Sequence, residues 1–253
     1  MEEQIKLYHG DCTELLPNIP TDSVDLVLCD LPYGVTDCAW DIALPLDTLW
    51  KEYRRVLRPC GTAVLFCVEP FTTHLINSNP AGFRYLWYWK KNNKTGAPFA
   101  RVQPMRCIEE IAVFYTDATN SKRRHTYNPQ GLVRLKKPKV NKPVGHHVYS
   151  AGKNSSVQEY TGYPHHLLEF NNEAAGKSRL HPTQKPVPLL EYLVRTYTNE
   201  GETVLDNCMG SGSTGVACIR AGRRFIGMEK DAHFFQIAKE RIEKEAAHKE
   251  LHT

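Results

Sequence analysis

The sequence lacks the marks of secreted and membrane-spanning proteins. None of its apolar runs approaches the roughly 18 residues that a membrane helix needs. The first residues, Met1-Glu2-Glu3-Gln4, are acidic and no apolar core follows them, so no secretory signal peptide is expected. We therefore expect a cytoplasmic protein.

The eight cysteines include no Cys-x-x-Cys pair. Several lie in apolar runs, as Cys29 and Cys67 do, and a free cysteine there behaves as a small buried hydrophobe. We therefore expect neither a metal site nor a disulfide framework.

The net charge is only +4, but it is unevenly distributed. Between Asp117 and Lys185 there are 12 Lys and Arg against four Asp and Glu, a balance of +8, so the rest of the chain carries −4. Six of the 11 histidines also fall in this stretch. Such a segment is typical of a surface that binds a polyanion, although a solvated basic loop has the same composition.

Short apolar runs alternate with amphipathic ones, which predicts an α/β fold. The expected strands cover residues 24–29, 62–68, 84–89, 108–115, 203–205 and 224–228, and the expected helices cover 46–57, 187–197, 215–221 and 231–247. Near-continuous apolar strands are typical of a parallel sheet with helices on both faces. We expect a doubly wound, Rossmann-like, mostly parallel sheet.

Residues 117–177 interrupt this pattern with clusters of Asn, Pro, Gly, Lys and His, and no regular structure is expected there. So long a segment inside a compact domain is usually functional or disordered, and its several tyrosines favour the first. The predicted organisation is one catalytic domain of residues 1–116 and 178–253 with an insert of residues 117–177.

A glycine-rich turn follows the expected strand at 203–205. Gly210-x-Gly212-x-x-Gly215 formally matches the dinucleotide fingerprint, in which the backbone approaches a ligand closely. Glu229 ends the next strand and can accept hydrogen bonds from ribose hydroxyls. A tight turn with a helix-capping acid has the same residues. The pattern alone does not separate a nicotinamide cofactor from S-adenosylmethionine, but Asp206 favours the latter because it can accept a hydrogen bond from an α-ammonium group.

Asp30-Leu31-Pro32-Tyr33 follows a buried strand. Proline restricts Leu31 to extended geometry, which gives its carbonyl a fixed direction. The Asp30 carboxylate and the Leu31 carbonyl can each accept one N–H of an aromatic amine and so aim its lone pair at an electrophilic methyl. Tyr33 can stack on the base, although a strand-end turn with a core tyrosine is the plainer alternative.

Together these motifs resemble those of the amino-group DNA methyltransferases. Asp30-Leu31-Pro32-Tyr33 resembles their Asp-Pro-Pro-Tyr motif, and residues 206–212 resemble their cofactor loop. Residues 181–186, His-Pro-Thr-Gln-Lys-Pro, look like the segment ahead of that loop, and residues 8–12 look like the N-terminal Gly-Asp element. The motif order is similar to the circularly permuted β class, and the resemblance covers residues 5–116 and 178–245.

The resemblance implies a DNA methyltransferase that uses S-adenosylmethionine on the N6 amine of a flipped adenine, since Asp rather than Ser opens the motif. It implies a target-amine site made of Asp30, Leu31, Pro32 and Tyr33. It implies cofactor contacts from Asp11, Cys12, His181, Thr183, Gln184, Lys185, Asp206, Met209, Gly210, Ser211, Gly212, Thr214 and Glu229. Leu31 and Asn207-Cys208 depart from the family's usual Pro and Pro-Phe. The second departure puts the packing against the cofactor in question.

The basic insert is the expected target-recognition region for duplex DNA. Its candidate phosphate contacts are Arg123, Arg124, Lys136, Lys137, Lys139 and Lys142. The resemblance alone suggests a homodimer, and it leaves open whether a cognate restriction endonuclease forms a restriction-modification pair with the chain. N4-cytosine methylation, methylation of RNA or protein, a nicotinamide-dependent oxidoreductase and a non-catalytic DNA-binding protein are the alternatives.

Overall fold

The computed structural model describes residues 4–34, 44–116, 125–141, 155–172 and 184–251. The chain divides into two compact units, one of residues 1–128 and 166–253 and a smaller one of residues 129–165.

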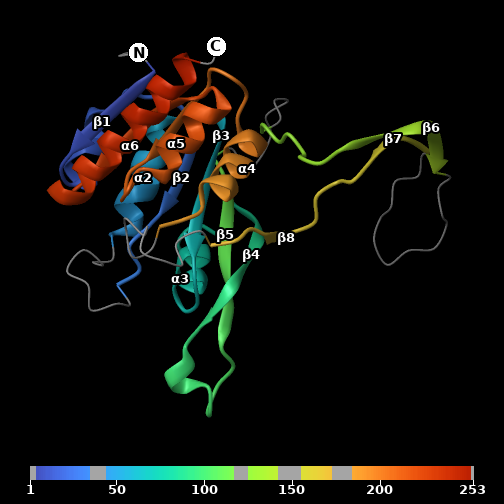
Figure 1. Ribbon diagram of the computed structural model, residues 1–253, viewed down its shortest axis with the longest axis horizontal. Coiled ribbons are helices and arrows are strands. Elements are labelled where there is room, and N and C mark those ends of the chain that lie inside the picture. Colours follow the sequence, from blue (N-terminus) through green and yellow to red (C-terminus); the bar gives the residue numbers. More distant parts are fainter. Residues whose placement is uncertain (1–3, 35–43, 117–124, 142–154, 173–183, 252–253) are drawn as a thin grey trace. The chain divides into compact units, whose positions relative to one another are not determined.

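The larger unit contains a mixed sheet of eight strands (Figure 1). From one edge to the other these are β1 (Ile5–His9), β10 (Arg224–Glu229), β9 (Thr203–Asp206), β2 (Val24–Asp30), β3 (Leu57–Cys67), β5 (Arg106–Tyr115), β4 (Phe83–Thr95) and β8 (Leu167–Glu169). The first five strands are parallel to one another. Strand β5 is antiparallel to both its neighbours, and β8 is parallel to β4. The predicted doubly wound, mostly parallel sheet is confirmed.

Helices cover both faces of the sheet. One apolar core joins it to α1 (Cys12–Leu15), α2 (Leu46–Val56) and α3 (Phe71–Ser78), and the other joins it to α4 (Val187–Tyr197), α5 (Ser213–Ala221) and α6 (Ala232–Glu250). Alternation along β2 builds both cores, because Leu26 and Leu28 face one and Val27 and Cys29 face the other. Among the described helices, none has the length and apolar character to cross a membrane.

The two strands that carry the sequence motifs are neighbours at the centre of the sheet. The chain leaves β9 through α5 toward β10 and leaves β2 through α2 toward β3, in opposite directions. The carboxyl ends of two such strands border a crevice, which is where open α/β sheets bind ligands. Asp206 ends β9 and Asp30 ends β2, so both acids lie at this crevice.

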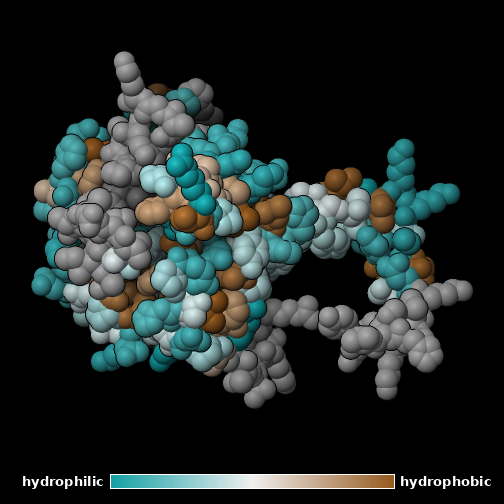
Figure 2. Space-filling model, turned by 90° about the horizontal axis from the view of Figure 1, so that it is seen from below, coloured by the Kyte–Doolittle hydropathy of each residue, from teal (hydrophilic) through white to brown (hydrophobic). Residues whose placement is uncertain are grey.

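Strands β4 and β5 are longer than the predicted 84–89 and 108–115. They form a hairpin that runs well beyond the rest of the sheet and ends near a short 3-10 turn, Ala97–Phe99 (Figure 1). Its outer part is polar and mostly exposed, so no apolar alternation marks it in the sequence. Figure 2 views the molecule from the side of the hairpin tip and shows apolar patches scattered among hydrophilic surface.

The expectation that residues 117–177 lack regular structure is wrong. Strands β6 (Val133–Asn141) and β7 (Ser156–Thr161) pair antiparallel in the smaller unit, and β8 joins the edge of the main sheet. Because β6 and β7 are mostly exposed, burial imposes no hydrophobic period on them. Strand β1 and helices α1 and α3 also went unpredicted, since each is short and its stability comes from tertiary packing.

A buried hydroxyl network ties α4 to the hairpin strand β4. Tyr197 Oη accepts a hydrogen bond from Trp87 Nε1 at 2.5 Å and lies 3.0 Å from Tyr85 Oη. We expect Tyr197→Phe to lower the free energy of unfolding by about 1–3 kcal/mol, because it leaves the buried indole N–H without its acceptor. Urea denaturation measures this. The matched control, Tyr163→Phe, removes a hydroxyl from a 58% exposed ring and should change stability by less than about 0.5 kcal/mol. Equal effects of the two variants would contradict the assignment.

Candidate active site

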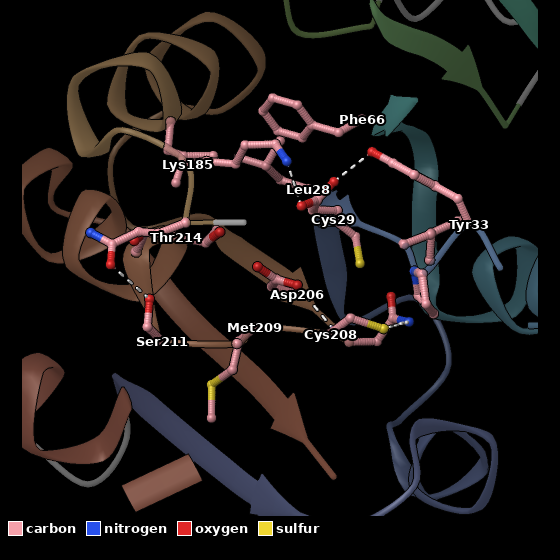
Figure 3. A pocket seen from close by; sticks show the side chains of 18 of the residues that line it. Leu28, Cys29, Tyr33, Phe66, Lys185, Asp206, Cys208, Met209, Ser211 and Thr214 are labelled. Atoms are coloured by element: carbon pink, nitrogen blue, oxygen red, sulfur yellow. Dashed lines mark hydrogen bonds and ion pairs between the residues drawn. The ribbon is translucent and has the colours of Figure 1, made fainter. Parts of the chain in front are cut away.

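A pocket of about 840 Å³ opens at the crevice between β2 and β9 (Figure 3). The turn after β2 lines it on one side, and the glycine-rich turn after β9 together with the end of β10 lines it on the other. Strands β4 and β5 supply further lining from the base of the hairpin. One cavity therefore contains both sequence motifs.

The turn after β2 forms the first wall. Asp30 Oδ1 accepts a hydrogen bond from Tyr33 Oη at 2.6 Å, and the Tyr33 ring packs 5.0 Å from that of Phe71. Burial and the charge of Asp30 raise the pKa of Tyr33 well above its usual value, so the phenol stays a proton donor. Leu31 is only 3% exposed and also lines the pocket.

A chain of alternating charges joins this wall to β4 and β5. Lys185 Nζ lies 2.5 Å from Asp30 Oδ2 and 3.5 Å from Glu109 Oε2, and Lys91 Nζ lies 2.7 Å from Glu109 Oε1. Burial opposes the charge on Lys185, but Asp30 and Glu109 outweigh it and raise its pKa. Burial would likewise raise the pKa of Glu109, yet the two lysines hold it below the usual value. Lys185 and Glu109 are therefore both charged at neutral pH.

The opposite wall contains two carboxylates of a different character. Burial raises the pKa of Asp206 to about 6, while the backbone N–H of Cys208 donates to it at 3.1 Å. Burial also raises the pKa of Glu229, whose two oxygens accept from the backbone N–H groups of Gly210 at 2.9 Å and Asp231 at 2.8 Å. Within the described part of the chain neither carboxylate forms an ion pair.

Asp11 completes this wall from the end of β1. It accepts from Lys230 Nζ at 2.9 Å and from the backbone N–H of Thr13 at 2.9 Å, and these bonds lower its pKa to about 2. Asp11 therefore remains ionised. Unlike Asp206 and Glu229, it pairs with a lysine.

Glycine gives the loop its close packing. Gly212 begins α5 in the left-handed region, with φ of 76°, and a Cβ there would lie 3.0 Å from Ala238 of α6. Gly227 of β10 leaves room for Met209, whose sulfur would lie 2.4 Å from a Cβ at that position. Both glycines set the loop's position rather than forming pocket wall.

Most of the residues that the sequence pointed to line this one pocket. They are Asp11, Cys12, Asp30, Leu31, Pro32, Tyr33, Gln184, Lys185, Asp206, Met209, Gly210, Ser211, Thr214 and Glu229. Gly212 is not part of the lining. His181, Thr183, Arg123, Arg124 and Lys142 lie outside the described residues, and Lys136, Lys137 and Lys139 lie exposed on β6 of the smaller unit.

The sequence reasoning missed several lining residues: Phe66, Trp89, Lys91, Glu109, Lys230 and Phe234. Glu109 had a usable signal, since it and Glu110 are two acids that precede an apolar run in the same strand. Phe66, Trp89 and Lys91 had none, because only the pairing of β3, β5 and β4 brings their side chains to the crevice. Lys230 and Phe234 reach it from the turn after β10 and the start of α6.

Comparisons with known proteins agree with this geometry. The model of the DNA methylase family matches residues 24–240. The type II methyltransferase M2.LlaDCHI of Lactococcus lactis subsp. cremoris is 28% identical over 98% of this chain and 92% of its own. The DNA adenine methyltransferase YhdJ of Escherichia coli is 26% identical over 94% of this chain and 82% of its own.

Solved structures share the fold. The complex of M1.HpyAVI with S-adenosylmethionine superposes with a TM-score of 0.65 at 24% identity, covering 94% of this chain and 98% of that one. The cytosine-N4-specific PvuII methyltransferase also gives 0.65, at 17% identity and with 96% and 92% covered. Because the family model spans most of the chain, the oxidoreductase alternative falls away. The chain belongs to the DNA methylase family, whose methyl donor is S-adenosylmethionine.

Proposed function

We propose that this protein transfers a methyl group from S-adenosylmethionine to the N6 amine of an adenine flipped out of duplex DNA. One observation carries the proposal: Asp30 with Leu31, and Asp206 with Glu229, line the same cavity from the ends of neighbouring strands. A donor held by the second pair can therefore reach an amine held by the first.

The charges of the opposite wall, which contains Asp206, Glu229 and Asp11, are suited to bind S-adenosylmethionine. Asp206 is a buried carboxylate without a cation among the described residues, and its raised pKa shows that the ionised form is poorly stabilised. An α-ammonium group of the ligand would supply the missing charge. Glu229 would accept from the ribose hydroxyls, and Asp11 would approach the adenine. When bound, this cofactor supplies an electrophilic methyl on a sulfonium centre.

The first wall fits an aromatic amine. The lone pair of such an amine is delocalised into the ring, so the nitrogen becomes nucleophilic only when its geometry changes. Asp30 and the Leu31 carbonyl would each accept one N–H and favour tetrahedral nitrogen, and Asp30 would also stabilise the positive charge that develops there. Holding nucleophile and donor in line supplies much of the rate, and no covalent enzyme intermediate is needed.

Adenine is the preferred target, with cytosine N4 as the alternative. Asp rather than Ser opens the motif, and YhdJ, which matches along most of the chain, is named as an adenine methyltransferase. The fold does not decide this, since the PvuII enzyme superposes equally well.

The β4–β5 hairpin is a second DNA-contacting element, in addition to the basic insert. Residues 90–106 contain five Lys and Arg and no Asp or Glu. Lys94, Arg101 and Arg106 are exposed, as are Phe99 and Val102 near the tip, at 57% and 83%. The paired strands of the hairpin line the pocket as far out as Asn93, Thr95 and Arg106, so DNA that delivers a base to Asp30 passes within reach of the hairpin. On β6, Lys136, Lys137 and Lys139 remain candidate phosphate contacts of the insert.

The proposal also covers the location of the protein in the cell, its partner enzyme and its assembly. Duplex DNA as substrate favours a cytoplasmic enzyme. The type II name of M2.LlaDCHI favours a role in restriction-modification with a cognate endonuclease, and a homodimer is the assembly that the family resemblance suggests.

Asp206→Asn should stabilise the cofactor-free protein at neutral pH. The folded-state pKa is about 6 against 3.8 for an unperturbed carboxyl, so the ionised group costs folding free energy above pH 6 and nothing below about pH 4. The variant should therefore gain about 1–3 kcal/mol at pH 7.5 and little at pH 4, measured by urea denaturation. It should also bind S-adenosylmethionine more weakly in calorimetry. A stability difference that is independent of pH would refute this account.

Asp30→Ala should lower methyl transfer by at least about 10²–10³-fold, because the amine loses the acceptor that stabilises its charge. Tritium transfer from labelled S-adenosylmethionine to duplex DNA measures the rate, and calorimetry should show that cofactor binding persists. Nucleoside digestion of wild-type product should release N6-methyladenine. Retained turnover in the variant would overturn the role of Asp30, and N4-methylcytosine would select the alternative target.

Changing Lys94, Arg101 and Arg106 together to Gln should weaken DNA binding and reduce the salt dependence. Each lost phosphate contact lowers the slope of log K against log salt by about 0.9, so a total change of about 2–3 is expected. Fluorescence anisotropy at several salt concentrations measures the slope. The control removes the same charge from exposed positions on α2 and α6, with Lys51, Arg54 and Lys244 changed to Gln. Equal slopes for the two triple variants would exclude the hairpin as a DNA contact.

A further inference from the structure

Lys185 occupies an unusual position for a residue expected to contact the cofactor. Its ammonium points to the target-amine wall, between Asp30 Oδ2 at 2.5 Å and Glu109 Oε2 at 3.5 Å (Figure 3). The side chain is 10% exposed, and its nitrogen lies 5.0 Å from the centre of the Phe66 ring. A lysine buried to this degree stays charged only through its anionic partners.

We propose that Lys185 is a positioning residue of the methyl-transfer reaction, which fixes the Asp30 carboxylate for the target amine and is itself held by Glu109. This inference rests on the proposed function. It moves Lys185 from the cofactor contacts to the target side, and it gives a role to Glu109, which no sequence motif indicated.

The contacts of Asp30 show how the carboxylate is fixed. A carboxyl group rotates readily about its last bond unless both oxygens are held. Tyr33 donates to Oδ1 and Lys185 donates to Oδ2, so the plane of the carboxylate is set before any base arrives. Each oxygen accepts about two hydrogen bonds, which leaves room for an amine N–H without breaking either contact.

Glu109 resolves an electrostatic conflict in this arrangement. A cation paired with Asp30 alone would oppose the positive charge that develops on the attacking nitrogen. Glu109 shares Lys185, and Lys91 in turn lies 2.7 Å from Glu109. The charges of the two anions and the two cations balance. Lys185 therefore holds the orientation of Asp30 without cancelling the whole negative charge that the attacking nitrogen meets.

Sequence position explains why only the fold reveals this role. Lys185 lies 155 residues after Asp30 and directly ahead of Pro186, which caps the start of α4. Helix α4 packs against β2 and the other helices of its face, and this packing brings the preceding residue to the carboxyl end of β2.

The pH profile is the most direct readout. The groups that act on Asp30 are Lys185 ahead of α4, Tyr33 in the same turn, Glu109 on β5, and Cys29 and Asp206 on β2 and β9. Removing the Lys185 ammonium should move the acidic limb of the kcat-against-pH profile to higher pH, because the Asp30 carboxylate loses the cation that stabilises its charge. Removing Glu109 should move this limb to lower pH, because Lys185 then pairs with Asp30 alone.

The experiment compares Lys185→Met, Glu109→Gln and the control Lys239→Met in the full-length protein with S-adenosylmethionine and duplex DNA. Lys239 also pairs with a glutamate, Glu243, but on the exposed surface of α6 and outside the pocket lining. At saturating substrates Lys185→Met should lower kcat by about 10–100-fold, leave the cofactor Kd unchanged and shift the acidic limb up by about one pH unit. Lys239→Met should match the wild type.

Three outcomes would overturn the proposal. In the first, Lys185→Met raises the cofactor Kd and leaves kcat intact, which makes Lys185 a cofactor contact. In the second, kcat falls without a pH shift, which makes its role structural. In the third, the two variants shift the limb in the same direction. Should Lys185→Met fail to fold, the downward shift in Glu109→Gln decides alone. Failure of the wild type to methylate DNA would instead refute the proposed function.

Discussion

The parallel pairing of β2 with β9 is the constraint on which the rest of this structure depends. The last residues of the two strands, Asp30 and Asp206, are 176 residues apart in the sequence, and the strands register through Leu26 and Val27 against Val204 and Leu205. Because parallel strands place their carboxyl ends at one edge of the sheet, that register puts both terminal acids in one crevice. A slip of one residue would turn every side chain of β2 to the opposite face, exchange the two apolar cores and remove Asp30 from the pocket.

The two acids then behave differently because of their surroundings. Asp30 lies in a balanced set of charges with Lys185, Glu109 and Lys91, whereas Asp206 is buried among backbone donors and thiols and has a pKa near 6. In the proposed function, the first arrangement holds a carboxylate in a fixed orientation for a neutral guest, the amine. The second leaves a carboxylate without a cation, which a charged ligand would supply. The stability that Asp206 costs the cofactor-free protein would then be the counterpart of its affinity for the donor.

In the proposed function, the hairpin and the basic insert extend the chemistry of the pocket to a large substrate. A base can reach Asp30 only after leaving the helical stack, which costs a few kcal/mol and must be offset by contacts elsewhere on the DNA. The cationic, partly apolar outer half of β4 and β5 continues from strands that also line the pocket, so it can couple those contacts to the position of the flipped base.

The sequence by itself determined the fold class and both motif turns, and it pointed to Asp30, Asp206 and Glu229, which line one pocket. It could do so because apolar strands ending in an acid, a proline or a glycine-rich turn reflect local constraints on the backbone. It did not predict the full hairpin, β6 to β8, or the roles of Glu109 and Lys91, because those depend on which strands pair and carry no hydrophobic period of their own. Lys185 shows the difference most clearly: its motif marked it as important, but only the packing of α4 against β2 decided that its ammonium meets Asp30.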